Sequence, residues 1–164
     1  MTARRPAKDL TRVWTVVLTA VLFAAALLFL LTGAARSPAS RLSFIEGQPR
    51  AGSLTVLDGD RQVLTYVYGD RLPPELGPEQ ARSCYIHPLY SLDGEVLTED
   101  FPRDHLHHHG LFWTWPSVEV RGVSTQSWHP AEPPLRQRFV KWVEREVTDA
   151  GARLVVENTW KLGG

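Results

Sequence analysis

The first hydrophobic segment is the apolar run from Val13 to Thr32, which is 20 residues long and holds no charged residue and no proline. A helix of this length spans the hydrocarbon core of a bilayer, whereas a core helix of a soluble domain shows a polar face every turn. Basic residues precede the run (Arg4, Arg5, Lys8 and Arg12), and basic flanks stay in the cytoplasm. The pattern predicts a basic cytoplasmic N-terminus (1–12) and a transmembrane anchor (13–35) with its N-terminal end in the cytoplasm. The rest of the chain would then be exported.

Cleavage of this segment is the alternative to a retained anchor. Gly33-Ala34-Ala35 resembles the small-residue cleavage site of a signal peptide, and cleavage near Ala35 would release a secreted domain. The apolar run exceeds the roughly 7 to 15 residues of a signal peptide's hydrophobic region, which favours the uncleaved anchor. Residues 36–41 then form a polar linker in which Pro38 discourages helix, and an exported domain follows over 42–164.

The exported part begins with the pattern of a β-hairpin. Ser53 to Leu57 and Gln62 to Tyr68 are short runs rich in apolar and β-branched residues, and they are separated by Asp58-Gly59-Asp60-Arg61. An Asp-Gly pair between two such runs is a strong short-range hairpin signal. We therefore expect two antiparallel strands here.

A second hairpin is predicted near the end of the chain. Arg138 to Val147 and Arg153 to Trp160 flank the turn sequence Thr148-Asp149-Ala150-Gly151. The alternation of the first run breaks between Phe139 and Lys141 and between Trp142 and Glu144, but its β-branched and aromatic content favours a strand. The region between the hairpins is rich in Pro, Gly and Asp, with strand-like pieces at 83–87, 110–115 and 118–123. The predicted fold class is mainly β.

Composition excludes several classes of protein. The chain has 164 residues, 18 of them basic and 18 acidic, so it lacks the positive surface of a nucleic-acid-binding protein. Its single cysteine, Cys84, excludes an intramolecular disulfide framework and a zinc site built from cysteines. No Gly-rich phosphate loop and no Gly-x-Ser-x-Gly elbow is present.

The candidate chemistry is a histidine-rich stretch between His87 and Trp115. An extended backbone from Asp104 to Gly110 would place His105, His107 and His109 on one face and His108 on the other. Three imidazoles on one face could bind a divalent metal such as zinc, copper or iron, with neighbouring aspartates orienting them. The same groups could instead act as acids and bases, because imidazole titrates near neutral pH. A solvated loop that binds metal only adventitiously is the third interpretation.

Several motifs around these histidines resemble the bacterial PmoA-like family, also called methane oxygenase PmoA. The resemblance covers about residues 53–160 and is carried by Tyr85-Ile86-His87-Pro88-Leu89-Tyr90, Asp93-Gly94, Thr98-x-Asp100-Phe101-Pro102, Asp104-His105-x-His107-His108-x-Gly110-Leu111 and Glu157-Asn158-x-Trp160. It implies a β-sandwich of the carbohydrate mutarotase/lyase-like type, here preceded by one transmembrane helix. It also implies the bacterial inner membrane, with the domain in the periplasm. Family members of roughly 300 residues imply that the sheet is incomplete at Gly164 and is finished by a missing C-terminal part or a second chain.

The functional hypothesis is an enzyme that processes a carbohydrate or glycoside. Its predicted catalytic residues are His105, His107, His108, Asp104 and His87, and its predicted substrate contacts are Tyr90, Asp100 and Trp113. Metal ligation by His105, His107 and His109 is the alternative role of the cluster. The competing hypothesis is a non-catalytic sugar- or metal-binding module or an inactive truncated remnant. A metal-dependent oxygenase, as the family name claims, is the third, although a methane monooxygenase subunit has many membrane helices and this chain has one predicted segment.

Overall fold

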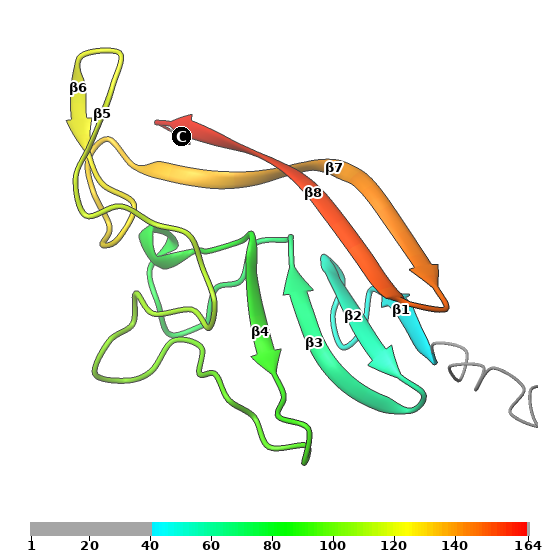
Figure 1. Ribbon diagram of the computed structural model, residues 1–164. Coiled ribbons are helices and arrows are strands. Elements are labelled where there is room, and N and C mark those ends of the chain that lie inside the picture. The colour runs from blue at the N-terminus through cyan, green and yellow to red at the C-terminus, as the bar shows by residue number, and fades with distance from the viewer. Residues whose placement is uncertain (1–40, 164) are drawn as a thin grey trace, which may run out of the picture. The chain divides into compact units, whose positions relative to one another are not determined.

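The computed structural model describes residues 41–163, and most of its regular structure is antiparallel β-sheet (Figure 1). The expected mainly β class is therefore confirmed. The elements in chain order are β1 (Leu42–Glu46), β2 (Ser53–Asp58), β3 (Arg61–Val67), the 3-10 turn η1 (Pro78–Gln80), β4 (Tyr85–Leu89), β5 (Val118–Val120), β6 (Val123–Thr125), β7 (Leu135–Thr148) and β8 (Gly151–Leu162).

Strands β1 to β4 form one four-stranded antiparallel sheet in chain order. The predicted first hairpin is β2–β3, in which Asp58 pairs with Arg61 across the turn. Gly59 has a φ of +60°, a left-handed conformation that glycine adopts without steric cost. The Asp-Gly signal therefore located this turn correctly.

The predicted second hairpin is β7–β8, which pairs from Leu135 and Leu162 to Thr148 and Gly151. Its two register shifts fall between Phe139 and Lys141 and between Trp142 and Glu144. The alternation of the sequence breaks at the same places, because each extra residue moves the following side chains to the other face.

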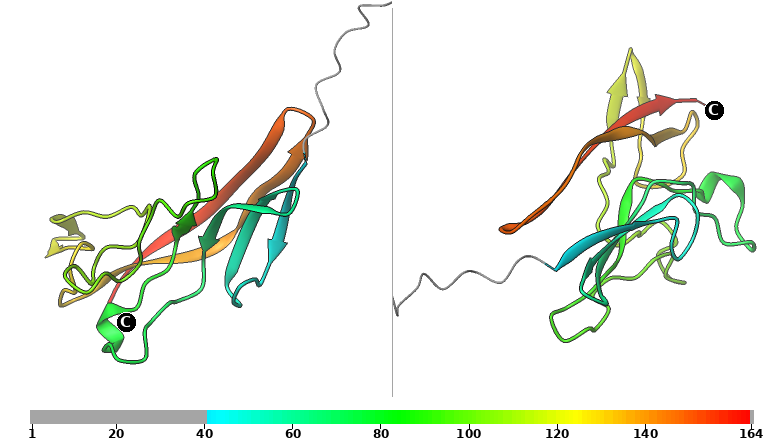
Figure 2. Two further views of the ribbon diagram at one scale, coloured as in Figure 1. Left: turned by 90° about the horizontal axis from the view of Figure 1, so that it is seen from below. Right: turned by 90° about the vertical axis from the view of Figure 1, so that its right-hand side faces the viewer.

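The β7–β8 hairpin lies against one face of the four-stranded sheet (Figures 1 and 2). The Tyr66 ring meets Trp142 at 5.8 Å between centroids, and the Tyr68 ring meets Phe139 at 4.8 Å. The Tyr66 hydroxyl also exchanges hydrogen bonds with the Asn158 side chain. Aromatic pairs at these separations contribute beyond the area they bury, so this layer contact holds the hairpin on the sheet.

The opposite face of the sheet carries buried polar side chains. Ser53, Thr55 and Thr65 are almost fully buried, and the Thr55 and Thr65 hydroxyls lie 2.9 Å apart. Both Ser53 and Thr55 donate to the carbonyl of Gln48. Each buried hydroxyl is thus satisfied, as burial of polar groups requires.

Three strand-like pieces differ from expectation. The piece predicted at 83–87 begins two residues later, at Tyr85, because Cys84 has a φ of +64° and leaves the extended region. Residues 110–115 form only one isolated bridge, between Ile86 and Leu111, and not a strand. The piece at 118–123 becomes the small hairpin β5–β6, whose turn residues Arg121 and Gly122 both have positive φ.

Within residues 41–163 no helix is both long and apolar enough to cross a membrane. The predicted cytoplasmic N-terminus (1–12) and anchor (13–35) lie outside the described residues. The described residues belong to one unit, Ala39–Gly164.

Candidate functional site

The histidine-rich segment is a pair of turns, and the predicted extended backbone is wrong. The His105 N–H donates to the Pro102 carbonyl at 3.0 Å, and the His108 N–H donates to the His105 carbonyl at 2.9 Å. These local bonds replace the ladder bonds of a strand, so the rule that places alternate residues on one face does not apply.

Three of the predicted catalytic histidines meet in an outer imidazole cluster, formed by His105, His107, His108 and His129. The His105 and His108 rings stack at 4.8 Å, and the His107 ring lies 4.0 Å from that of His129. Burial, followed by the charges of the neighbouring imidazoles, lowers the pKa of His107 to about 4. Asp104 bonds His105 at 3.0 Å, and this bond lowers the pKa of the exposed Asp104 carboxyl.

His109 turns the other way, into the interior, where it is 1% exposed. The rings of Tyr85, Phe101 and Phe112 surround it at centroid distances of 5.5, 4.4 and 5.6 Å. Its Nδ1 lies 2.9 Å from Oδ1 of Asp100, whose Oδ2 accepts a 2.7 Å hydrogen bond from the Tyr85 hydroxyl. Tyr85, Asp100 and His109 therefore form a hydrogen-bonded chain, called here the Tyr–Asp–His chain.

The local backbone explains how this chain of contacts arises. Asp100 and His109 face each other in an isolated bridge, and the Gly110 N–H donates to the Glu99 carbonyl. Gly110 has a φ of +59°, and a Cβ there would lie 2.2 Å from the Ile86 carbonyl oxygen. Only glycine fits such an approach. It lets the segment after His109 pass directly against β4 and so brings His109 beside Tyr85.

The second ring nitrogen of His109 is the unusual atom of the site. Among the described residues, Nε2 of His109 is the one buried side-chain nitrogen or oxygen without a hydrogen-bond partner. A carboxylate accepts hydrogen bonds, so Nδ1 carries the ring proton and Nε2 of the neutral ring presents a lone pair. Burial lowers the pKa of His109, although the hydrogen bond to Asp100 acts in the opposite direction. The lowered pKa keeps the ring neutral. A basic atom without a partner in the described chain is thus held at a buried position.

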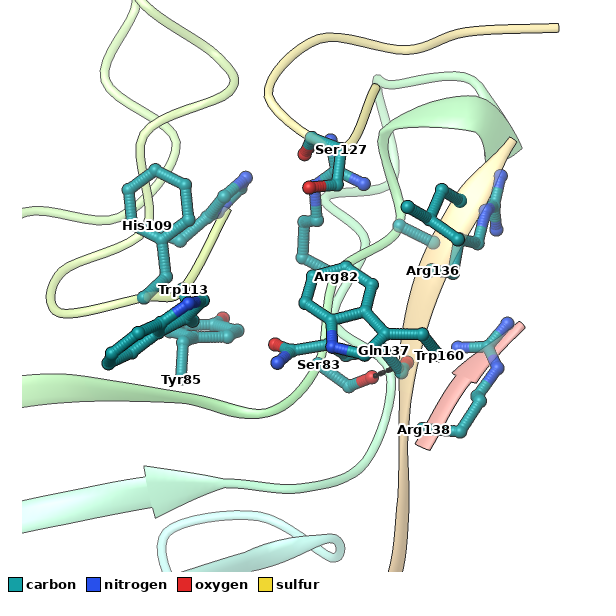
Figure 3. Close-up of a pocket in the computed structure, with 13 residues that line it drawn as sticks. Arg82, Ser83, Tyr85, His109, Trp113, Ser127, Arg136, Gln137, Arg138 and Trp160 are labelled. Atoms are coloured by element: carbon teal, nitrogen blue, oxygen red, sulfur yellow. Dashed lines mark hydrogen bonds between the residues drawn. The ribbon is translucent and has the colours of Figure 1, made fainter. Parts of the chain in front are cut away.

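His109 lines a small pocket between the sheet and the β7–β8 hairpin (Figure 3). The pocket has room for about 20 Å³, enough for a water molecule or one small polar group. Arg82, Arg136 and Arg138 line it together with Ser127 and Gln137. Its wall is therefore strongly basic.

The pocket adjoins an aromatic groove of about 490 Å³, a volume typical of ligand sites. Trp113, Trp115 and Trp160 line this groove. The Trp115 and Trp160 rings meet at 5.0 Å, and Trp113 is 70% exposed. Since Trp113 and Trp160 line both spaces, a ligand on the groove could place one group in the pocket.

The other predicted residues are distributed unevenly. Trp113 lines the pocket beside His109, whereas Asp100 is joined to that pocket only through its hydrogen bond to His109. His87 bonds Thr98 through Nδ1 and lines another pocket together with Tyr85 and Asp100. Tyr90 follows the end of β4, where its hydroxyl donates to Gln62.

The arginines and Trp160 were not among the predicted site residues, because 54 positions separate Arg82 from Arg136 in sequence. The Arg-x-Arg pattern at 136–138, which places two cations on one strand face, is the signal that could have indicated the site. The hairpin then carries that face toward Arg82.

The predicted metal set of His105, His107 and His109 loses the geometry that motivated it, because His109 is interior and bonded to Asp100. In the part of the chain that the structure describes, no three His, Cys, Asp or Glu side chains are grouped so as to hold a metal ion.

The model of the Family of unknown function (DUF6807) matches residues 53–164, which is more than half of the chain. The chain therefore belongs to this family. The prediction of a PmoA-like protein is wrong, since the family match is to DUF6807 and no named relative supports the other assignment. No curated protein and no solved structure matches the chain.

Proposed function

We propose that the protein is an exported enzyme that processes a carbohydrate, with His109 as the general base of its site. The observation that carries this proposal is the buried Nε2 of His109, which has no partner in the described chain while Nδ1 is bonded to Asp100. Buried polar atoms are normally paired, and an unpaired one needs a functional explanation. We attribute this atom to contact with a substrate hydroxyl, because His109 lines the pocket.

The chemistry of the Tyr–Asp–His chain suits this role. Asp100 fixes the ring orientation and the tautomer, and its charge stabilises the imidazolium that forms when Nε2 takes a proton. The Tyr85 hydroxyl in turn holds the second oxygen of Asp100. Each group is positioned by another, so the base is held in place before the substrate arrives.

The aromatic groove supports a carbohydrate as the substrate. Flat indole faces pack on the apolar C–H faces of sugar rings, and polar groups at the end of a groove fix the orientation of the ligand. Trp113 and Trp115 are 70% and 39% exposed, respectively. Exposed tryptophans of this kind contribute little to the core, and we attribute their position to ligand contact.

The proposal includes the finer architecture and the location of the domain. The β1–β4 sheet and the β7–β8 hairpin would be two layers of a β-sandwich of the carbohydrate mutarotase/lyase-like type. Residues 13–35 would anchor this domain to the outer side of the bacterial inner membrane. The hydrophobicity of the 13–32 run and its basic flank support this location.

The test compares turnover and binding on a panel of glycosides and oligosaccharides with the full chain. His109→Gln should abolish turnover and retain groove binding, because the groove is separate from the base. His129→Gln, a change of the same type at an exposed histidine, should keep both. Full turnover by His109→Gln would refute the assignment of the base. Binding without turnover by the wild-type chain would favour a non-catalytic sugar-binding module.

A further inference from the structure

The pocket beside His109 contains two guanidinium groups without an anionic partner. Arg138 forms an ion pair with Asp70. Within residues 41–163, Arg82 and Arg136 form no ion pair with any carboxylate. Glu79 lines a neighbouring pocket with both arginines but pairs with neither. Within residues 41–163, these two guanidinium groups therefore lie at the pocket without a direct ion pair.

Arg82 is held in place by backbone and has donors left over. Its Nη2 donates to the carbonyls of Ser127 and Trp128 at 3.2 and 3.4 Å, and its other side-chain nitrogens make no hydrogen bond in the described chain. Arg136 is fixed in a similar way, by a 3.0 Å bond from Nη2 to the Pro78 carbonyl. Two guanidinium groups are thus oriented by neutral acceptors rather than neutralised.

Placing these two cations in one pocket costs free energy. Burial, followed by the charge of Arg136, lowers the pKa of Arg82. Like charges in a partly dry site are unfavourable unless an anion enters. A site that retains this cost is arranged for a negative ligand group, and planar guanidinium donors match carboxylates and phosphates.

We propose that the pocket binds the carboxylate of an acidic sugar, with Arg82 and Arg136 as its binding residues and the sugar ring on the Trp113–Trp160 groove. This inference rests on the proposed function. A carboxylate is small enough for the arginine-lined part of the pocket, and the sugar ring would lie on the adjoining groove. The adjoining groove supplies the apolar surface that a free inorganic anion would not need.

The experiment measures the affinity of the full chain for three probes: D-glucuronate, D-glucose and acetate. Glucuronate should bind at least about tenfold more tightly than either of the others, because it alone engages both the arginines and the groove. Arg82→Gln should lower the glucuronate affinity about tenfold and leave the glucose affinity unchanged. Arg153→Gln, at an exposed arginine of β8 paired with Glu144, is the matched control and should change neither.

The outcomes separate this inference from the proposed function. Equal binding of glucose and glucuronate would overturn the carboxylate pocket and leave a carbohydrate site. Equal binding of acetate and glucuronate would overturn the acidic sugar and, with it, the carbohydrate function. If Arg82→Gln does not fold, Arg82→Lys tests the same point. This variant keeps the charge but loses the planar guanidinium group, so glucuronate binding should weaken and glucose binding should persist. Unchanged glucuronate binding would contradict the proposal.

Discussion

The Nδ1 atom of His109 lies 2.9 Å from Oδ1 of Asp100, across the two arms of the loop that Glu99 and Gly110 close. This contact fixes the orientation of the ring and leaves its other nitrogen, Nε2, without a partner in the described chain. It also links the histidine to Tyr85 on β4 through the second carboxylate oxygen. The orientation of the proposed base therefore depends on residues from two segments of the chain.

Removing the Asp100 charge should destabilise the protein and the site together. Asp100→Asn leaves the side chain in place but replaces an acceptor of two hydrogen bonds by an amide. We expect the free energy of unfolding to fall by about 1–3 kcal/mol, measured by denaturant titration. Asp104→Asn, at an exposed carboxylate, should leave it almost unchanged. Equal effects at the two positions would contradict the structural role of Asp100.

Gly110 should be among the least replaceable glycines. In Gly110→Ala the new Cβ would lie 2.2 Å from the Ile86 carbonyl oxygen, and the positive φ would add backbone strain. The free energy of unfolding should therefore fall by about 3 kcal/mol. Gly94→Ala is the matched control, because Gly94 has a φ of +87° and no atom within 4 Å of an added Cβ. Its cost should be only the backbone strain, about 1 kcal/mol. Similar losses in both variants would argue against close packing at Gly110.

Acid should weaken the folded state through His107. Its folded pKa, about 4, lies below the ordinary value of 6.5, so between these values the unfolded chain binds a proton that the folded chain does not. The free energy of unfolding contributed by this group is present above pH 6.5 and is lost as the pH falls toward 4. His107→Gln should flatten the pH dependence in this window, measured by denaturant unfolding at several pH values. Parallel curves for variant and wild type throughout the window would refute this interpretation.

Two tryptophans should separate ligand binding from stability. Trp113→Ala should reduce carbohydrate affinity with little change in unfolding, because Trp113 is 70% exposed. Trp142→Ala should instead lower the free energy of unfolding by about 2 kcal/mol, since Trp142 contacts Tyr66, Tyr68 and Phe139 between the two layers. Calorimetric binding and denaturant titration on both variants check the pair. A loss of affinity only in Trp142→Ala would place the ligand elsewhere.

Local signals in the sequence were sufficient for the β2–β3 and β7–β8 hairpins and insufficient for the site. The Asp-Gly turn at residues 58–59 and the broken alternation near Trp142 are properties of neighbouring residues, so the hairpins and their irregularities could be predicted. The conformation of the histidine segment depends on turn bonds to Pro102 and on the bridge between Asp100 and His109. Those contacts compete with an extended backbone and leave no periodic pattern.

The basic pocket was harder still to predict. Arg82 comes before β4 and Arg136 lies on β7, and the packing of the hairpin onto the sheet brings both to one pocket. Each arginine alone is an ordinary polar residue, and only the lack of an ion pair within residues 41–163 distinguishes the two arginines. Such an absence is a property of the folded chain.

The most direct test of His109 as the base is nitrogen-15 NMR of the histidine rings in the full chain, with the His109 signals assigned by His109→Gln. We expect a neutral ring protonated at Nδ1, with an Nε2 signal that is typical of a free lone pair and that moves when D-glucuronate is added. A ring protonated at Nε2, or an Nε2 signal that is unchanged at saturating sugar, would contradict the assignment of His109 as the base of the site.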